Sequence, residues 1–176
     1  MIRILAISGS LRAQSSNTAL LRAMSLLAPD EIEIIIYNDT STLPYFNPDI
    51  DPFNDKFVMS FRSQVEHAHG LLIAAPEYAH GLPGAFKNAL DWLVGCEKFP
   101  GKPVALINAS SRAKHAQSSL FEIFKTMSAD IVKEASLTIP ITPGRELSHE
   151  KISASPELSS LINTVLNNLV YRIKNR

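Results

Sequence analysis

The sequence predicts an α/β fold in which a five-stranded parallel sheet lies between two layers of helices. Short apolar runs alternate along the chain with longer segments in which apolar residues recur every three to four positions. The apolar runs lack the polar alternation of strands that have one face in water, so both faces of the sheet should be buried. The length of 176 residues suits one domain, and we expect residues 1–176 to form it.

Five apolar runs predict the strands. Each is short, and turn-forming residues such as Ser8-Gly9-Ser10 and Pro100-Gly101 separate them from their neighbours. The second run is rich in β-branched residues, and the fifth is the least regular. In chain order, the predicted strands are residues 2–7, 32–37, 71–75, 103–109 and 131–139.

Helical segments lie between these strands and after the last one. The first covers residues 17–28 and ends at Pro29, and the second ends at Gly70. Residues 38–54 contain three prolines and are expected to form a loop. The third helix is expected over residues 82–94. The apolar faces are, in order, Leu20, Met24 and Leu27; Phe57, Phe61, Val65 and Ala68; Leu82, Phe86, Leu90 and Leu93; Leu120, Phe124 and Met127; and Leu158, Leu161, Ile162, Val165, Leu166 and Leu169.

Right-handed crossovers between parallel strands turn this order of elements into a doubly wound three-layer sandwich. Five strands fit the flavodoxin-like strand order 2-1-3-4-5 better than a six-stranded dinucleotide-binding fold. Ligands of such sheets bind beyond the carboxyl ends of the strands, where the winding reverses. We therefore expect a site in the loops after the first and third strands, with the loop after the fourth strand beside it.

The charge balance and the cysteine content exclude several classes of protein. Lys and Arg total 17 and Asp and Glu total 17, which disfavours a nucleic-acid-binding protein and an acidic electron carrier. Cys96 is the only cysteine, so the chain can form neither an internal disulfide nor a multi-thiolate zinc site. No signal peptide or run of about 18 apolar residues is present, so we expect a cytoplasmic protein that does not enter membranes.

The loop after the first strand carries the groups of a phosphate site. It opens a helix, and backbone N–H groups at a helix N-terminus bind phosphate well. Ser10, Arg12, Ser15 and Asn17 add side-chain donors, of which the guanidinium suits a phosphate best. The same Ser and Asn residues would also serve as ordinary helix caps. Neither Gly-x-Gly-x-x-Gly nor a Walker A motif follows the strand, which disfavours an NAD site and a nucleoside triphosphatase.

The loop after the third strand contains a defined turn and an aromatic ring. Proline and glycine in residues 76–84 leave backbone amides free to face a ligand, and Tyr78 is placed to lie along a planar ring. In the helix that follows, Phe86, Leu90 and Trp92 have the spacing of core residues. Lys87 and Asp91, four positions apart, form no more than a surface ion pair by this reasoning.

The two loops resemble the signatures of the NADPH-dependent FMN reductase family, a flavodoxin-like group that includes chromate and quinone reductases. The first signature is Gly-Ser-Leu-Arg followed by Ser and Asn, and the second is Pro-Glu-Tyr followed by Pro-Gly and Lys-Asn-Ala-Leu-Asp-Trp. The resemblance runs from about Met1 to Asp130, and the last quarter agrees only in its pattern of elements. The matching residues are 9–12, Ser15 and Asn17 for the first signature, and 76–78, 83–84 and 87–92 for the second.

The resemblance implies an enzyme that binds FMN and takes hydride from NADPH. The electron acceptor would be a quinone, a free flavin, an azo compound or a metal oxyanion. Because the flavin carries the redox chemistry, no side chain is expected to act as acid, base or nucleophile. The family resemblance also implies a homodimer or homotetramer in which two paired subunits together line the flavin site. The implied flavin-binding residues are Ser10, Arg12, Ser15, Ser16 and Asn17 at the phosphate, Pro76, Glu77, Tyr78 and Ala79 along the isoalloxazine, and Ser110.

Two departures from the family pattern leave alternatives open. Ala79 stands where family members often have Asn, and residues 110–117 contain no glycine where the family tends to have a glycine-rich turn. Arg112 and Lys114 in that segment either attract the 2′-phosphate of NADPH or belong to a solvated basic loop. The altered loop also keeps a second function open, namely a flavodoxin-like electron carrier or flavin-binding regulator without turnover of its own.

The histidines and the cysteine do not predict a metal or nucleophile site. His67 and His69 are two residues apart, so they do not share a helix face, and no carboxylate cluster accompanies them. His80 is expected to be a turn residue of the second loop. Cys96 has no second thiol and is expected to be a small buried hydrophobe.

Overall fold

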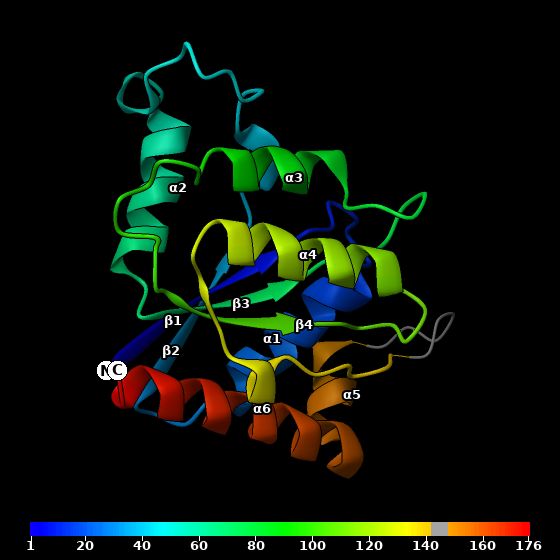
Figure 1. Cartoon of the computed structure of the whole chain (residues 1–176). Coiled ribbons are helices and arrows are strands. Elements are labelled where there is room, and N and C mark those ends of the chain that lie inside the picture. The colour runs from blue at the N-terminus through cyan, green and yellow to red at the C-terminus, as the bar shows by residue number, and fades with distance from the viewer. Residues whose placement is uncertain (142–147) are drawn as a thin grey trace.

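The strands form one parallel sheet in the order β2-β1-β3-β4-β5, as the sequence predicts. The computed structural model describes residues 1–141 and 148–176 (Figure 1). Strand β1 lies between β2 and β3, with Ile4 level with Ile34 on one side and with Gly70 on the other. The strands are β1 (Ile2–Ser8), β2 (Ile32–Tyr37), β3 (Gly70–Ala74), β4 (Pro103–Ile107) and β5 (Asp130–Ile131).

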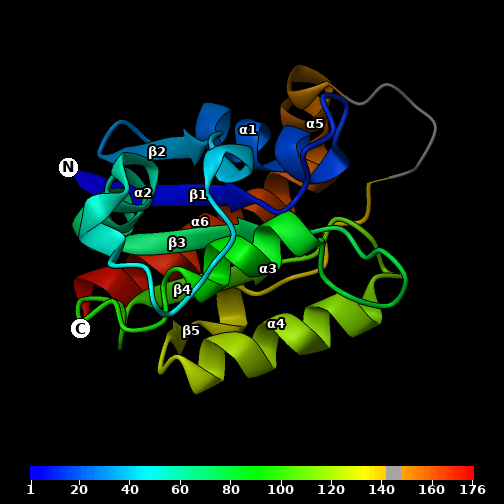
Figure 2. The same ribbon diagram turned by 90° about the horizontal axis from the view of Figure 1, so that it is seen from above.

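Helices cover both faces of the sheet, so the molecule has three layers (Figures 1 and 2). Helices α1, α5 and α6 lie on one face, and α2, α3 and α4 lie on the other. No helix among the described residues is long and apolar enough to span a membrane. The helices are α1 (Ser16–Leu27), α2 (Lys56–His67), α3 (Gly84–Asp91), α4 (Lys114–Thr126), α5 (His149–Ala154) and α6 (Pro156–Lys174).

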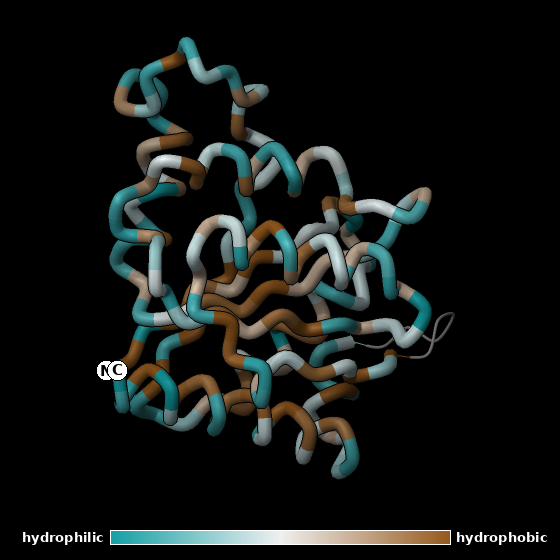
Figure 3. Tube along the Cα trace, viewed as in Figure 1, coloured by the Kyte–Doolittle hydropathy of each residue, from teal (hydrophilic) through white to brown (hydrophobic). Residues whose placement is uncertain are grey.

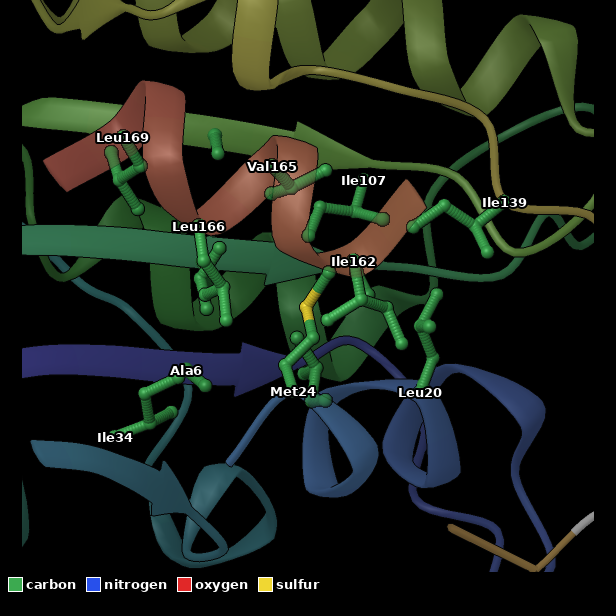
Figure 4. Close-up of a cluster of buried hydrophobic side chains, with 14 of the residues drawn as sticks. Ala6, Leu20, Met24, Ile34, Ile107, Ile139, Ile162, Val165, Leu166 and Leu169 are labelled. Carbon is green, nitrogen blue, oxygen red and sulfur yellow. The ribbon is translucent and has the colours of Figure 1, made fainter. Parts of the chain in front are cut away.

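The pleat of the strands divides the apolar side chains between two cores. Along β1, Ala6 points to one helical layer and its neighbours Leu5 and Ile7 point to the other. Strands β3 and β4 contain no polar side chain (Figure 3), and every residue of both is buried. Figure 4 shows the core beneath α1 and α6, where Met24 meets side chains from α6. Burial on both faces explains why these runs lack polar alternation.

The prediction for the fifth strand is wrong in its extent. Only Asp130 and Ile131 pair with β4, because residues 133–135 form a 3-10 turn that leaves the sheet. The Ser136 hydroxyl fills the gap, since it accepts a hydrogen bond from the Leu106 N–H and donates one to the Val132 carbonyl. The chain then rejoins β4 through an isolated bridge between Asn108 and Thr138.

Other differences concern helices and the long loop. Helix α3 is shorter than predicted, since it begins after Pro83 and has given way to turns before Gly95, whose φ is +76°. The short helix α5 is not predicted at all, because six residues carry too little periodicity. The loop 38–54 contains two 3-10 turns, at Thr40–Thr42 and Pro52–Asn54.

Candidate functional site

A cavity of about 440 Å³ opens at the carboxyl ends of β1, β3 and β4. The loops that follow these three strands form its wall, which is the position that the winding of the sheet predicts. The volume lies within the ~300–1,000 Å³ range of ligand pockets. Its lining residues are Ser10, Arg12, Gln14, Ser15, Ser16, Asn17, Ala75, Pro76, Glu77, Tyr78, Asn108, Ala109, Ser110, Arg112, Ala113 and Ile141.

The loop after β1 lies tightly against the end of β3. The Gly9 N–H donates to the Ala74 carbonyl at 2.8 Å, and a Cβ atom at Gly9 would lie 2.7 Å from the Ala75 Cβ. Only glycine allows this approach. The Ser10 N–H donates to the Ser8 hydroxyl, which also bonds to Thr18 at 2.8 Å. The start of the loop is therefore fixed to both neighbouring elements.

The N-terminus of α1 points donors at the cavity. Ser15 caps the helix by accepting a hydrogen bond from the Thr18 N–H. The backbone N–H groups of Ser16 and Asn17 find no acceptor within the described part of the chain, as expected for a first turn. Both residues line the cavity, so a bound anion would meet these donors and the positive end of the helix dipole.

Asn17 and Arg12 each carry polar groups without a partner. The Asn17 amide oxygen is buried and has no hydrogen-bond partner among residues 1–141 and 148–176, which is costly unless a ligand satisfies it. The Arg12 side chain is exposed and makes no ion pair with any described residue. An unpaired guanidinium and an unsatisfied amide in one cavity wall are suited to a phosphorylated, polyhydroxylated ligand.

Glu77 ties the loop after β3 to helix α4. One carboxylate oxygen accepts the Ala116 N–H at 2.9 Å, and Ala113 at the helix cap offers no side-chain acceptor of its own. Glu77 thus caps α4 from 39 residues away. The bond from Ala116 is the main cause that holds the pKa of Glu77 below its ordinary value of 4.5.

This linkage makes the Glu77 contribution to stability depend on pH. A carboxylate with a lowered folded-state pKa stabilises the protein fully above the unfolded value of 4.5, and the effect disappears as the pH falls through the folded value. We expect Glu77→Gln to lower the thermal midpoint at pH 7, and the gap to wild type to close in acid. Unfolding curves from pH 7 to pH 3 test this, and a gap that stays constant over that range would contradict it.

A two-residue turn follows Glu77 and has an unusual backbone. Tyr78 and Gly81 exchange both backbone hydrogen bonds, at 3.0 and 2.9 Å. The two residues between them, Ala79 and His80, have φ values of +49° and +59°. Positive φ at both central positions is the geometry of a type I′ turn, which favours Asn and Gly. The Asn that the family resemblance leads one to expect at position 79 would therefore suit this backbone conformation.

Ala79→Asn is expected to stabilise the protein by about 0.5–1 kcal/mol, because Asn tolerates the left-handed conformation better than Ala does. Denaturant unfolding measures the change. The same exchange at Ala154, an exposed residue of helix α5, should instead be slightly destabilising, since Asn is a poorer helix former. Equal effects at both positions would show that the backbone conformation at Ala79 is not the cause.

Asn108 organises the third loop of the site, in place of the missing glycines. Its buried amide accepts the Ser110 N–H at 3.0 Å and donates to the Ala113 carbonyl at 3.2 Å. The Ser110 hydroxyl in turn accepts the Arg112 N–H. Side-chain hydrogen bonds therefore close this turn and leave the cavity open, with Ser110, Arg112 and Ala113 in its wall.

The structure brings nine of the ten sequence-predicted site residues to this one cavity. Ala79 is the exception, since it lies in the turn beside the cavity and does not line it. Arg12 and Tyr78, which come from different loops, line the same space. The sequence does not predict the remaining lining residues. Their position directly after a strand or at the tip of a loop is the only sequence feature that could have identified them. They are Gln14, Ala75, Asn108, Ala109, Ala113 and Ile141.

The histidines, the cysteine and the ion pair to which the sequence assigns no chemistry have structural roles. The His67 ring bonds to the Ser63 carbonyl, and the His69 ring accepts the Arg3 N–H. Cys96 is buried as expected, and burial raises the pKa of its thiol, which makes it a poor nucleophile. Lys87 and Asp91 form the predicted ion pair.

Residues 2–143 match the family described as NADPH-dependent FMN reductase. The chain belongs to this family. The match extends beyond residue 130, where the resemblance of the two loop signatures ends. It includes the three loops that line the cavity, so the FMN reductase signatures and the cavity coincide.

Two curated relatives are similar to this chain in sequence. A 2-hydroxy-1,4-benzoquinone reductase of a Burkholderia species is 38% identical over 112 residues, or 62% of this chain. An NAD(P)H-dependent FMN reductase of Pseudomonas aeruginosa is 39% identical over 113 residues, also 62% of the chain. These matches cover 61% and 60% of the relatives' own lengths, so the chain is matched to about three fifths of each relative.

The whole chain has a similar fold to solved flavoenzymes. FerB, a flavoenzyme NAD(P)H:acceptor oxidoreductase from Paracoccus denitrificans, superposes with a TM-score of 0.80 at 23% identity. The superposition covers 99% of this chain and 98% of FerB. The sheet of this FMN reductase family member thus has the flavodoxin-like arrangement that its sequence predicts.

Proposed function

We propose that residues 1–176 form a single FMN-binding domain that passes electrons from NADPH to a small-molecule acceptor. The single observation that carries this proposal is the cavity. It combines the aromatic side chain of Tyr78 with a phosphate-type loop. Within the described part of the chain, Arg12 of that loop has no ion-pair partner and the Asn17 amide oxygen has no hydrogen-bond partner. Membership of the NADPH-dependent FMN reductase family supports the same conclusion.

The residues of the cavity fit FMN. Arg12 and the first N–H groups of α1 would bind the phosphate, together with the hydroxyls of Ser10, Ser15 and Ser16. The buried Asn17 amide would gain the partner that it lacks. Pro76, Glu77, Tyr78 and Ser110 would border the ring system, and Ala79 would support the turn beside it.

When bound, FMN supplies the redox chemistry, because its ring accepts a hydride and passes on the electrons. The chain then has to bind, orient and shield, and no acid, base or nucleophile is required of it. Tyr78, with about half of its surface exposed, is free to pack along a planar group. The bond from Ala116 fixes the Glu77 carboxylate, which keeps the loop next to Tyr78 in place.

Arg112 is the residue of this chain best placed to prefer NADPH over NADH. It lines the cavity and forms no ion pair in the described structure, whereas Lys114 begins helix α4 outside the lining. We expect Arg112→Ala to raise KM for NADPH by about tenfold, the value of one charge-assisted hydrogen bond, with little change for NADH. Lys114→Ala is the matched control, and equal effects on both nucleotides would contradict this role.

We propose a quinone as the first acceptor to test. One curated relative is named a 2-hydroxy-1,4-benzoquinone reductase, and another, from Escherichia coli, a quinone reductase. Free flavin, azo compounds and metal oxyanions remain further candidates from the family resemblance. Steady-state rates with each acceptor at fixed NADPH rank them directly.

We also propose that the protein forms a homodimer or homotetramer. Tyr45 and Phe53, between β2 and α2, are 91% and 72% exposed, which is unusual for aromatic side chains and suits an interface. Sedimentation equilibrium measures the mass, and a monomer at micromolar concentration would contradict this part of the proposal.

The decisive experiment combines an absorbance spectrum of the bound flavin with its reduction by NADPH. The purified protein is titrated with FMN, the flavin absorbance is recorded, and NADPH is added without oxygen. Bleaching of the bound flavin followed by re-oxidation with a quinone supports the proposal. A protein that binds no FMN would overturn it. Binding of FMN without reduction by NADPH would favour the electron carrier or flavin-binding regulator instead.

A further inference from the structure

Two histidines and a carboxylate meet at the rim of the cavity. His80 lies in the turn after β3, and His115 lies in the first turn of α4, 35 residues further along the chain. Together with Glu77 they offer three ligand atoms that all lie within 4.8 Å of one another. The two imidazole rings are stacked, with centroids 4.4 Å apart and planes 12° from parallel. Neither ring is buried, so packing in the core does not explain their meeting.

The backbone of the turn holds His80 in this position at a cost. His80 and Ala79 both adopt the left-handed conformation, which costs an L-residue about 1–2 kcal/mol. Both hydrogen bonds between Tyr78 and Gly81 maintain the turn. Strain of this kind is concentrated at functional sites, where it places a side chain that would otherwise point elsewhere.

The carboxylate of the cluster is also oriented in advance. Glu77 accepts the Ala116 N–H, and a carboxylate has lone pairs left after one such bond. Metal-ligating carboxylates are commonly held in this way by a second hydrogen bond.

We propose that Glu77, His80 and His115 bind one divalent transition-metal ion at the rim of the cavity. Two imidazoles and one carboxylate are the ligand types preferred by Zn²⁺, Ni²⁺ and Cu²⁺, whereas Ca²⁺ and Mg²⁺ require oxygen ligands. The Glu77 carboxylate also brings a negative charge to the site, which suits a dication. Three protein ligands also leave a coordination position open, as in catalytic rather than structural zinc sites.

Closing the site requires only small movements. The ligand atoms of a tetrahedral zinc ion lie ~3.3 Å apart, given bonds of ~2.0–2.1 Å. The present separations of up to 4.8 Å therefore have to shrink by about 1.5 Å or less. Because the two rings are stacked, their nitrogen lone pairs lie in nearly parallel planes, and one exposed ring has to rotate about χ2 before both rings can bind the same ion. The bound ion would link the turn 78–81 to the first turn of α4.

Zinc binding to the tag-free full chain tests this inference. Isothermal titration with Zn²⁺ is expected to give one site per chain in wild type, and about tenfold or greater weakening in His115→Ala. His67→Ala is the matched control, because this exposed histidine lies outside the cluster. His80→Gly is the second variant, since glycine removes the ligand and also relieves the positive φ, and should therefore fold at least as well as wild type.

Thermal unfolding gives an independent readout that does not involve activity. Excess Zn²⁺ should raise the midpoint of wild type and of His67→Ala but not that of His80→Gly or His115→Ala, because only a ligand of the folded state stabilises it. The titrations are run with and without FMN, so failure of flavin binding does not decide them. Absence of one-site binding in wild type, or equal affinity in His80→Gly, would overturn the inference.

Discussion

Replacing Gly9 with alanine is expected to destabilise the protein by about 1–3 kcal/mol, or roughly 2–12 °C in the thermal midpoint. The added Cβ would lie 2.7 Å from the Ala75 Cβ and 3.0 Å from a ring carbon of Phe86. Ala75 and Phe86 are both buried, so neither neighbour has free space in which to move. The end of β1 and the end of β3 must therefore separate.

The same substitution should also weaken FMN binding, because Gly9 sets the distance between the two main loops of the cavity. Arg12 and Asn17 follow Gly9 on one side, and Ala75 begins the loop that carries Tyr78 on the other. Equilibrium unfolding in denaturant measures the stability, and a fluorescence titration measures the Kd of FMN. Loss of stability with an unchanged Kd would show that Gly9 supports the fold but does not set the spacing of the two loops for FMN, which would contradict this prediction.

Gly84→Ala is the matched control. Gly84 is the first residue of α3, and a Cβ atom there would meet nothing within 4 Å. Its backbone has negative φ, so alanine is tolerated, and the smaller entropy of the unfolded chain should make the change neutral or stabilising by up to about 1 kcal/mol. If both glycine substitutions destabilise the protein equally, close packing at Gly9 is not the cause.

The sequence predicts the parts of the site that depend on local sequence, namely the ends of the strands and the loops that follow them. The apolar runs ending at Ser8 and Ala74 define strands, and a flavodoxin-like order places their carboxyl ends together. The loops after them contain most of the lining residues in two short segments. The strand order and the two loop motifs are therefore enough to predict most of the cavity wall, and nine of the ten predicted flavin-binding residues line the cavity.

Features that depend on distant contacts were not predictable in this way. Helix α4 has no local cap at Ala113, and its cap is Glu77 from another loop. His80 and His115 meet because β3 and β4 are neighbours and because α4 begins at Lys114, and no spacing in the sequence encodes both conditions. The length of the fifth strand is predicted wrongly for a related reason. The Ser136 hydroxyl, rather than a backbone carbonyl, accepts the hydrogen bond from the Leu106 N–H of β4.

Replacing Arg12 with alanine is expected to raise the Kd of FMN by about 10- to 150-fold, which corresponds to ~1.5–3 kcal/mol for a hydrogen bond to a charged group. Arg12 lines the cavity but makes no ion pair with the described residues, and its side chain is exposed. The thermal midpoint without FMN should therefore remain unchanged. A flavin fluorescence titration at two ionic strengths measures the loss and its dependence on charge.

Two further variants separate charge from geometry. Arg12→Lys keeps the positive charge but loses the planar two-point contact, so we expect it to recover only part of the affinity. Arg22→Ala removes an exposed arginine of α1 that lies outside the cavity lining, and it should leave the Kd unchanged. If Arg12→Ala binds FMN as tightly as Arg22→Ala does, the phosphate does not sit at the loop after β1, and the N-terminus of α1 is then only a capped helix end.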